Sequence, residues 1–165
     1  MADRADFERY VRQRSDRLLR TAYLLCRDWA TAEDLLQTAL AKAWTAWWRV
    51  GDNPDPYVYR ILANTHATWW RRRWRGEEPT PVLPERPAHG GADLLESRDV
   101  LRRALDCLPP RQRAVIVLRY FADLADPQIA EILGCSPVTV RSQASRALAR
   151  LRVDPAARSA VTMEG

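Results

Sequence analysis

The sequence predicts an all-α protein of two small helical domains, an N-terminal helical bundle and a C-terminal helix-turn-helix domain, joined by a flexible linker rich in proline and glycine. In both halves apolar residues recur at helical spacing, and neither half has an alternating strand run of useful length. Between them, residues 76–92 hold four prolines and three glycines in seventeen positions and show no hydrophobic period. We therefore expect domains at 1–75 and 93–154, the linker at 76–92 and a disordered tail at 155–165.

In the N-terminal domain the pattern predicts three helices. The first is long, the second opens at Thr31 with Asp34 at the capping-box position, and the third opens at Asp55-Pro56, where a capping residue precedes a proline. The loop from Arg49 to Asn53 contains Gly51 and cannot be a helix interior. The predicted inner faces are Phe7, Tyr10, Val11, Leu18, Ala22 and Leu25 on the first helix, Leu36, Ala39, Leu40, Ala43 and Trp47 on the second, and Val58, Ile61, Leu62, Thr65 and Trp69 on the third.

The chain has seven tryptophans, more than a three-helix core of this size needs. Three of them lie together with four arginines between Trp69 and Arg75. Arginine can neutralise phosphate while aromatic rings stack on unpaired bases, so this run suits a single-stranded nucleic acid. Two alternatives remain open: core tryptophans covered by arginine stems, or a segment lying on an anionic membrane surface.

Two helix openings only a few residues apart, Asp126-Pro127 and Ser136-Pro137, characterise the C-terminal domain. Asp126 and Ser136 are expected to cap, because their side-chain oxygens can accept free backbone N–H groups, and proline is favoured at the next position. Gly134 suits the left-handed residue that ends the first of these helices. The expected helices, Pro127 to Leu133 and Pro137 to about Arg152, form a helix-turn-helix.

The second of these helices has two unlike faces. One face is apolar, and the other is rich in hydrogen-bond donors and has no acidic residue. Such a face suits DNA reading, whereas the alternative, a merely solvated face, more often mixes acidic with basic residues. The apolar residues are Val140, Ala144, Ala147, Leu148 and Leu151, and the outer residues are Arg141, Ser142, Ser145, Arg146 and Arg150.

Charge and composition agree with a protein that binds a polyanion. The 165 residues carry a net charge of +5, with 14 basic and 9 acidic groups up to Arg75 and 9 and 5 from Asp99 to Arg152. Two basic halves suit two contacts with one polyanion. No apolar run approaches the ~18 residues of a membrane span and no signal peptide opens the chain, so we expect a cytoplasmic protein without membrane insertion.

The sequence offers little support for a bound cofactor or for catalytic activity. Cys26, Cys107 and Cys135 are far apart, lie in apolar contexts and form no C-x-x-C pair, so we expect buried free thiols and no metal site. A glycine-rich phosphate loop is absent, and no nucleophile lies beside a base. We therefore expect no cofactor and no enzymatic activity.

Four motifs in order resemble those of an extracytoplasmic-function sigma factor of the sigma-70 superfamily. They are residues 32–38 (AEDLLQT), 57–65 (YVYRILANT), 108–113 (LPPRQR) and 129–136 (IAEILGCS), and the likeness covers nearly all of residues 7–152. The tryptophan- and arginine-rich run further resembles an actinobacterial SigE-like subgroup. Two departures from the family pattern are Ala125-Asp126-Pro127-Gln128, which lacks the usual acids, and Gln143, where a basic residue is common.

The resemblance implies a promoter-recognition subunit that works when bound to core RNA polymerase, at the clamp of the largest subunit and at the flap, and that helps melt promoter DNA. The N-terminal domain would hold the -10 element and the C-terminal domain the -35 element. An anti-sigma factor is common in the family, although nothing in this chain requires one. The implied sites are Asp34, Gln37 and Leu40 for the polymerase, Asn64, Arg60, Arg71, Arg72 and Arg73 for the -10 element, with the loop from Arg49 to Asn53 beside a flipped base, and Arg141, Ser142, Ser145, Arg146 and Arg150 for the -35 element.

Two rival functions remain. A stand-alone helix-turn-helix regulator would share the C-terminal interpretation, but it leaves the N-terminal domain unexplained and would normally dimerise on a palindrome. A small recombinase or nuclease would need catalytic groups, and Glu33-Asp34 is the nearest approach to a carboxylate pair.

Overall fold

A computed structural model of the chain describes residues 3–74 and 100–153, and every regular element among these residues is helical. The all-α prediction is therefore confirmed. The predicted linker at 76–92 and tail at 155–165 lie outside the described residues, as do the side chains of Arg73 and Trp74. Within the described residues, no helix combines the length and apolar character needed to cross a bilayer.

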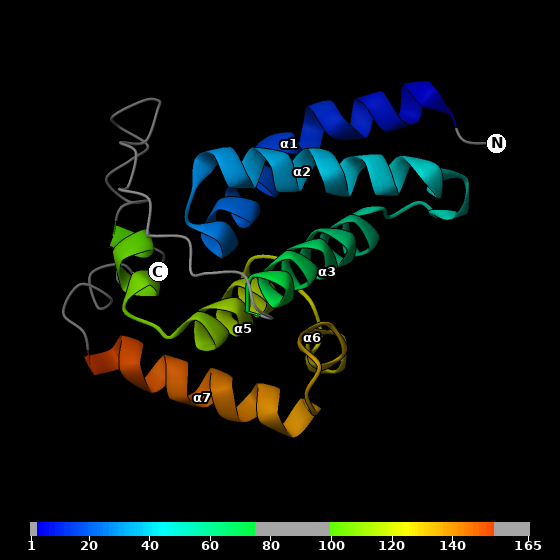
Figure 1. Cartoon of the computed structure of the whole chain (residues 1–165). Coiled ribbons are helices and arrows are strands. Elements are labelled where there is room, and N and C mark those ends of the chain that lie inside the picture. Colours follow the sequence, from blue (N-terminus) through cyan, green and yellow to red (C-terminus); the bar gives the residue numbers. More distant parts are fainter. Residues whose placement is uncertain (1–2, 75–99, 154–165) are drawn as a thin grey trace. The chain divides into compact units, whose positions relative to one another are not determined.

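The N-terminal unit consists of α1 (Arg4–Cys26), α2 (Trp29–Thr45), the short 3-10 helix η1 (Trp47–Arg49) and α3 (Asp55–Trp74). The second helix packs against both α1 and α3 (Figure 1). Leu18, Leu35 and Val58, one from each helix, are fully buried between them. A three-helix core therefore forms, as the apolar periodicity predicted.

The second helix begins earlier than the sequence suggested. Trp29 is its first residue, and Asp28 is the cap, since an Asp28 carboxylate oxygen accepts from the Thr31 backbone N–H at 2.9 Å and from the Thr31 hydroxyl at 2.6 Å. The prediction that Thr31 opens this helix was therefore wrong. The Thr31 hydroxyl is already a donor to Asp28, and a carboxylate is the stronger acceptor for the free N–H groups of the first turn.

The third helix buries a broader face than predicted. Val58, Leu62 and Thr65 are buried as expected, whereas Ile61 and Trp69 are only half-buried. Tyr59 and Ala63, which the predicted stripe omitted, are buried too. A helix that lies in a bundle of three contacts its neighbours over more than one stripe, and that breadth depends on tertiary packing.

The C-terminal unit contains a helical segment at 100–106, followed by α5 (Pro110–Tyr120), α6 (Asp126–Leu133) and α7 (Pro137–Val153). The last helix packs against both α5 and α6. The aliphatic core of this unit includes Leu118, Ile129 and Val140, and each of these side chains is nearly or fully inaccessible to solvent. This arrangement confirms the predicted helix-turn-helix, with α6 and α7 as its two helices.

The cysteines only partly match their prediction. All three are free, as expected, but Cys107 is exposed and Cys26 and Cys135 are half-buried, so none is fully buried. Cys107 directly follows the helical segment at 100–106, and its thiol donates to the Arg103 carbonyl at 3.3 Å. Its position at a helix end, rather than its apolar sequence context, determines its exposure.

Candidate nucleic-acid and protein interfaces

The turn between α6 and α7 has the geometry that the sequence predicted. Gly134 adopts φ 71°, in the left-handed region that glycine tolerates without strain, and the Cys135 N–H donates to the Ala130 carbonyl at 3.0 Å. Ser136 caps α7, because its hydroxyl oxygen accepts from the Thr139 N–H at 3.1 Å. A further hydrogen bond, from the Arg111 guanidinium to the Leu133 carbonyl at 3.3 Å, links the start of α5 to the end of α6. The orientation of α7 is thus fixed at its beginning.

The start of α6 differs from its prediction. Helix α6 includes Asp126 itself, Ala125 is the N-cap, and the Ala125 N–H donates to the Gln128 side-chain oxygen at 3.0 Å. The Asp126 carboxylate instead pairs with Arg119 of α5, with N···O distances of 3.3 Å. Asp126 is therefore not the cap. Its carboxylate ties α5 to α6, and Gln128, whose side chain at the third helical position accepts from the Ala125 N–H, was the overlooked sequence signal.

Helix α7 presents its donor-rich face to solvent. Val140, Ala144 and Ala147 are fully buried against the rest of the unit. All of the predicted outer residues are exposed, namely Arg141, Ser142, Ser145, Arg146 and Arg150. No acidic residue occurs in Pro137–Val153. The structure thus brings these five residues together on one helix as a surface suited to a polyanion.

In the N-terminal unit, the residues assigned to polymerase binding share one face of α2. Asp34 and Gln37 are exposed, and Leu40, three residues further on, is half-buried. Because Asp28 rather than Asp34 interacts with the first turn, the Asp34 carboxylate has no capping role. A polar pair beside a partly exposed leucine remains open to a partner.

On α3, Arg60, Asn64 and Arg71 are exposed and recur at i, i+4 and i+11, which places them on one strip of the helix. Arg72 is also exposed, beside this strip. The tryptophans nearby differ: Trp69 is half-buried, in agreement with a partly structural role, while Trp70 is 39% exposed.

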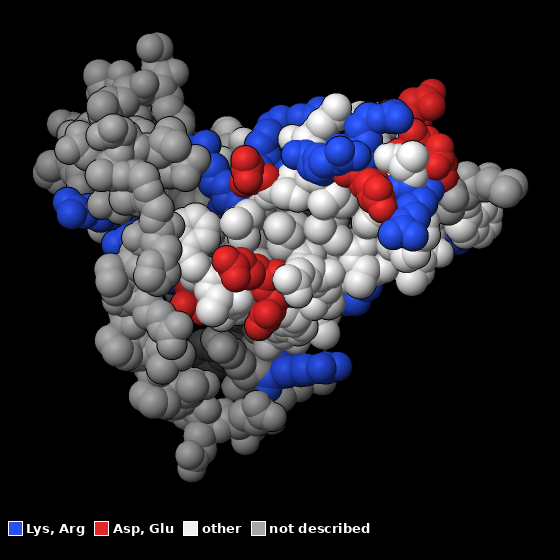
Figure 2. Space-filling view, turned by 90° about the horizontal axis from the view of Figure 1, so that it is seen from above, with Lys and Arg blue, Asp and Glu red and all other residues white. Residues whose placement is uncertain are grey.

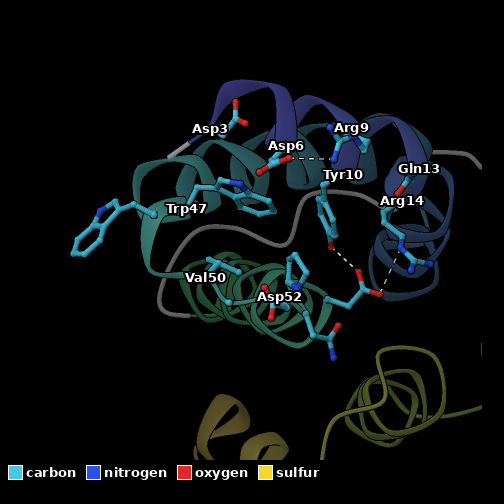
Figure 3. A pocket seen from close by; sticks show the side chains of 14 residues that line it. Asp3, Asp6, Arg9, Tyr10, Gln13, Arg14, Trp47, Val50 and Asp52 are labelled. Atoms are coloured by element: carbon cyan, nitrogen blue, oxygen red, sulfur yellow. Dashed lines mark hydrogen bonds and ion pairs between the residues drawn. The ribbon is translucent and has the colours of Figure 1, made fainter. Parts of the chain in front are cut away.

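A hollow lies where the loop before α3 meets α1 (Figure 3). Its walls include Tyr10, Arg14 and Asp55, whose side chains meet: the Tyr10 hydroxyl donates to one Asp55 carboxylate oxygen at 2.8 Å, and Arg14 lies 3.6 Å from the other. Burial, the hydrogen bond to Asp55 and the Asp55 charge together raise the pKa of Tyr10 well above its ordinary value. Tyr10 therefore stays protonated and is the donor. The sequence had suggested only a capping role for Asp55 and a core role for Tyr10.

The loop residues 50–53 line this hollow, but Asn64 does not. Asn64 lies nine positions after Asp55 on α3, or roughly 13 Å along the helix. The structure thus places the two parts of the expected base pocket on one domain but not in this one hollow. Arg49, the first residue of the predicted loop, belongs to η1 instead.

Aromatic rings surround the end of α2. Phe7 lies 5.1 Å from Trp44 and 5.0 Å from Trp47 between ring centroids, and Tyr10 lies 5.3 Å from Trp47. Trp47 is buried in this cluster, while the neighbouring Trp48 is 64% exposed, with the Arg49 guanidinium 5.3 Å from its ring centroid. Part of the tryptophan surplus therefore closes the core, and part of it faces solvent.

The basic residues in the described part of the chain differ in their surroundings. Figure 2 shows one face of the structure on which basic and acidic side chains lie next to each other. Helix α1 contributes two such pairs, Arg4 with Glu8 at 2.9 Å and Arg9 with Asp6 at 3.1 Å. The acid-free face of α7 is a different kind of surface, because its basic side chains have no acidic neighbour on their own helix.

Comparisons with known proteins agree with the motif resemblance. The family model described as sigma-70 region 2 matches residues 10–76, and that described as sigma-70, region 4 matches residues 98–151. The chain is 42% identical over 160 residues to the RNA polymerase sigma-E factor of Streptomyces coelicolor, covering 96% of this chain and 90% of that one. It is also 32% identical to the ECF RNA polymerase sigma factor SigE of Mycolicibacterium smegmatis, covering 88% of this chain and 60% of that one.

Among solved structures, the chain is similar to the sigma factor RpoE of Bartonella quintana, which was crystallised in complex with the anti-sigma factor NepR. The TM-score is 0.63 at 29% sequence identity, over 90% of this chain and 98% of that one. The fold is also similar to that of CnrH, solved with the cytosolic domain of CnrY, with a TM-score of 0.58 at 23% identity.

Proposed function

The chain belongs to the sigma-70 family as an extracytoplasmic-function sigma factor, and from that premise we propose how its residues divide the work of transcription initiation. The N-terminal helices, residues 1–75, bind core RNA polymerase and the -10 element, and residues 93–154 bind the -35 element. The observation that carries this proposal is the acid-free exposed face of α7. This helix follows the turn at Gly134 and lies within the residues that match sigma region 4.

In the -35 interaction, α7 lies in the major groove. Arg141 and Arg146 read bases there, since arginine can bond bidentately to guanine O6 and N7. Ser142 and Ser145 lie on the outer face with these arginines and can donate or accept. Arg150, nearer the C-terminal end of the helix, contacts phosphate and contributes affinity without sequence preference.

In the -10 interaction, the strip of Arg60, Asn64 and Arg71 on α3 follows the non-template strand, with Arg72 and Arg73 adding phosphate contacts. Asn64 offers a donor and an acceptor in one plane, which suits the edge of an extruded base. Loop residues 50–53 border the captured strand. Such capture offsets the few kcal/mol lost when a base unstacks, so melting needs no separate energy source in this chain.

Polymerase binding uses the exposed face of α2 that carries Asp34, Gln37 and Leu40. An acidic group in this face disfavours DNA and favours a protein partner, because phosphate repels carboxylate. The chain itself supplies no catalytic chemistry in this scheme, which belongs to the polymerase, and it acts in the cytoplasm where polymerase and chromosome are found. By analogy with the RpoE–NepR complex, an anti-sigma factor is a further candidate partner.

The decisive experiment changes the α2 face. Asp34→Arg together with Gln37→Glu should abolish co-purification with core polymerase while circular dichroism and thermal melting stay unchanged, because both side chains are exposed and neither caps the helix. Gln13→Glu with Asp16→Arg is the matched control, since it makes the same two changes three residues apart on the exposed side of α1.

Retained polymerase binding in the α2 double variant would show that this docking face is wrong. A wild-type protein that binds promoter DNA as a dimer but never binds core polymerase would instead support the stand-alone regulator. For strand capture, Asn64→Ala should leave polymerase binding intact and reduce permanganate reactivity of unpaired promoter thymines.

A further inference from the structure

Val138 is an exposed apolar side chain in the first turn of α7. It is 64% exposed, and among the large apolar residues exposed in the described part of the chain it is the only aliphatic one, the others being aromatic. The hydrogen bonds that cap the helix join Ser136 to Thr139 and do not involve the Val138 side chain. Valine is also a poorer helix former than alanine, so neither capping, packing nor helix propensity explains it.

Its place on the helix is informative. Ser142, Ser145 and Ala149 follow Val138 at i+4, i+7 and i+11, so these four exposed residues form one strip along α7. The buried residues Val140 and Ala144 lie on the opposite side. Val138 therefore points in the same direction as the serines of the DNA-reading face, at the end nearest the turn.

The first turn of a recognition helix is the part that reaches base edges in the major groove. Thymine alone of the four bases presents a methyl group there, and an apolar side chain is its natural contact. Ala149 shares the strip but lies about 16 Å further along the helix axis, away from the inserted end. Of the two apolar residues in this strip, Val138 is therefore the one that lies in the first turn.

We propose that Val138 is a specificity-determining residue that contacts the C5-methyl group of a thymine in the -35 element. The inference rests on the proposed function, in which α7 lies in the -35 major groove. It adds to that function an apolar selection at one base position, beside the polar selection by Arg141 and Arg146. Burying one methyl group against the valine predicts about a fourfold preference for thymine over a base that lacks it.

The test removes only the methyl group. The holoenzyme, reconstituted from core polymerase and the full chain, is used to select its promoters from a randomised -35 region. Each thymine of the selected -35 element is then replaced by deoxyuridine, which keeps the hydrogen-bonding pattern and lacks the C5-methyl. We expect about a fourfold loss of affinity at one position for the wild type. Val138→Ala should bind thymine and uracil promoters equally, whereas Val138→Thr, which keeps a methyl group at that place, should retain the discrimination.

Each other outcome contradicts the proposal. A selected -35 element without thymine, a wild type insensitive to every replacement, or a Val138→Ala variant with undiminished sensitivity would overturn the methyl contact while leaving -35 binding by α7 intact. Failure of the proposed function looks different: the wild-type holoenzyme would then select no -35 sequence at all. Folding is not at issue, because alanine favours the helix and the side chain is exposed.

Discussion

The two helical units differ in the residues that form their cores and in the segments that form their surfaces. All seven tryptophans lie in the N-terminal half. There an aromatic cluster and a part-buried Tyr10–Asp55 hydrogen bond lie at the end of the domain beside the loop before α3. The core residues of the C-terminal unit are mainly aliphatic, and its proposed DNA surface is the outer face of a single helix.

This difference distinguishes a surface formed by one helix from a surface formed by several packed segments. A face of one helix is specified by residues three and four apart, so it exists as soon as the helix forms. A surface made from a loop, the end of α2 and the beginning of α1 exists only when these segments have packed together. We therefore expect the hollow beside the loop before α3 to depend more strongly on tertiary interactions than the single-helix faces of α2, α3 and α7 do, and the predictions below test that contrast.

The largest loss of stability should come from truncating a buried leucine in the core of either unit. Leu35→Ala in α2 and Leu118→Ala in α5 each remove a nearly or fully buried side chain, and each should lower the free energy of unfolding of its own unit by about 2–5 kcal/mol. Denaturant melts of the full chain and of each half, followed by circular dichroism, measure both. If either substitution shifts both units equally, the two cores are not independent and the contrast fails.

The next effect concerns base reading by the single helix. Arg141→Ala and Arg146→Ala should each cost about 1–3 kcal/mol of discrimination at one or two -35 positions, because a bidentate base contact is lost. Arg150→Ala should weaken all promoters alike. Competition binding of the holoenzyme to a set of single-base -35 variants separates the two kinds of change. Uniform weakening by the first two substitutions would contradict their assignment as base readers.

A smaller effect should distinguish the true cap of α2. Asp28→Ala should destabilise the N-terminal unit by about 1 kcal/mol, since the carboxylate accepts from both the backbone and the hydroxyl of Thr31. Asp34→Ala, its matched control on the exposed face, should stay within about 0.5 kcal/mol of the wild type. Urea melts of the N-terminal half give both values. Equal losses would show that Asp34 stabilises the helix as much as Asp28 does and would contradict the assignment of Asp28 as the cap.

An effect of similar size tests the Tyr10–Asp55 contact. Tyr10→Phe should lower the stability of the N-terminal unit by about 1 kcal/mol at neutral pH, the usual net contribution of one hydrogen bond. The folded protein raises the pKa of Tyr10, so the unfolded chain loses this proton first, near pH 10. The contribution of Tyr10 is thus present below that pH and is lost above it.

The wild type should therefore lose stability more steeply than Tyr10→Phe when urea melts are repeated from pH 8 to about pH 11. Some alkaline loss should remain in the variant, because burial also raises the pKa of Tyr59. Parallel pH profiles for the two proteins would show that the hydroxyl does not interact with Asp55 in solution.

Local sequence by itself determined the helix-turn-helix. Ser136 caps α7 and Gly134 ends α6 as predicted, and the residues expected outside on α7 are all exposed. Each of these features depends on residues at most a few positions apart. The four family motifs likewise identified the family, and the matches to sigma regions 2 and 4 confirm it.

Only the tertiary structure decided how the acidic side chains are used. Asp55 and Asp126 both precede a proline and both looked like caps, yet one binds Tyr10, 45 residues away in sequence, and the other binds Arg119 of the preceding helix. A carboxylate has several nearby donors, and the choice among them depends on which helices pack together. Periodicity specifies a helix face, but it carries no information about partners that packing brings from other helices.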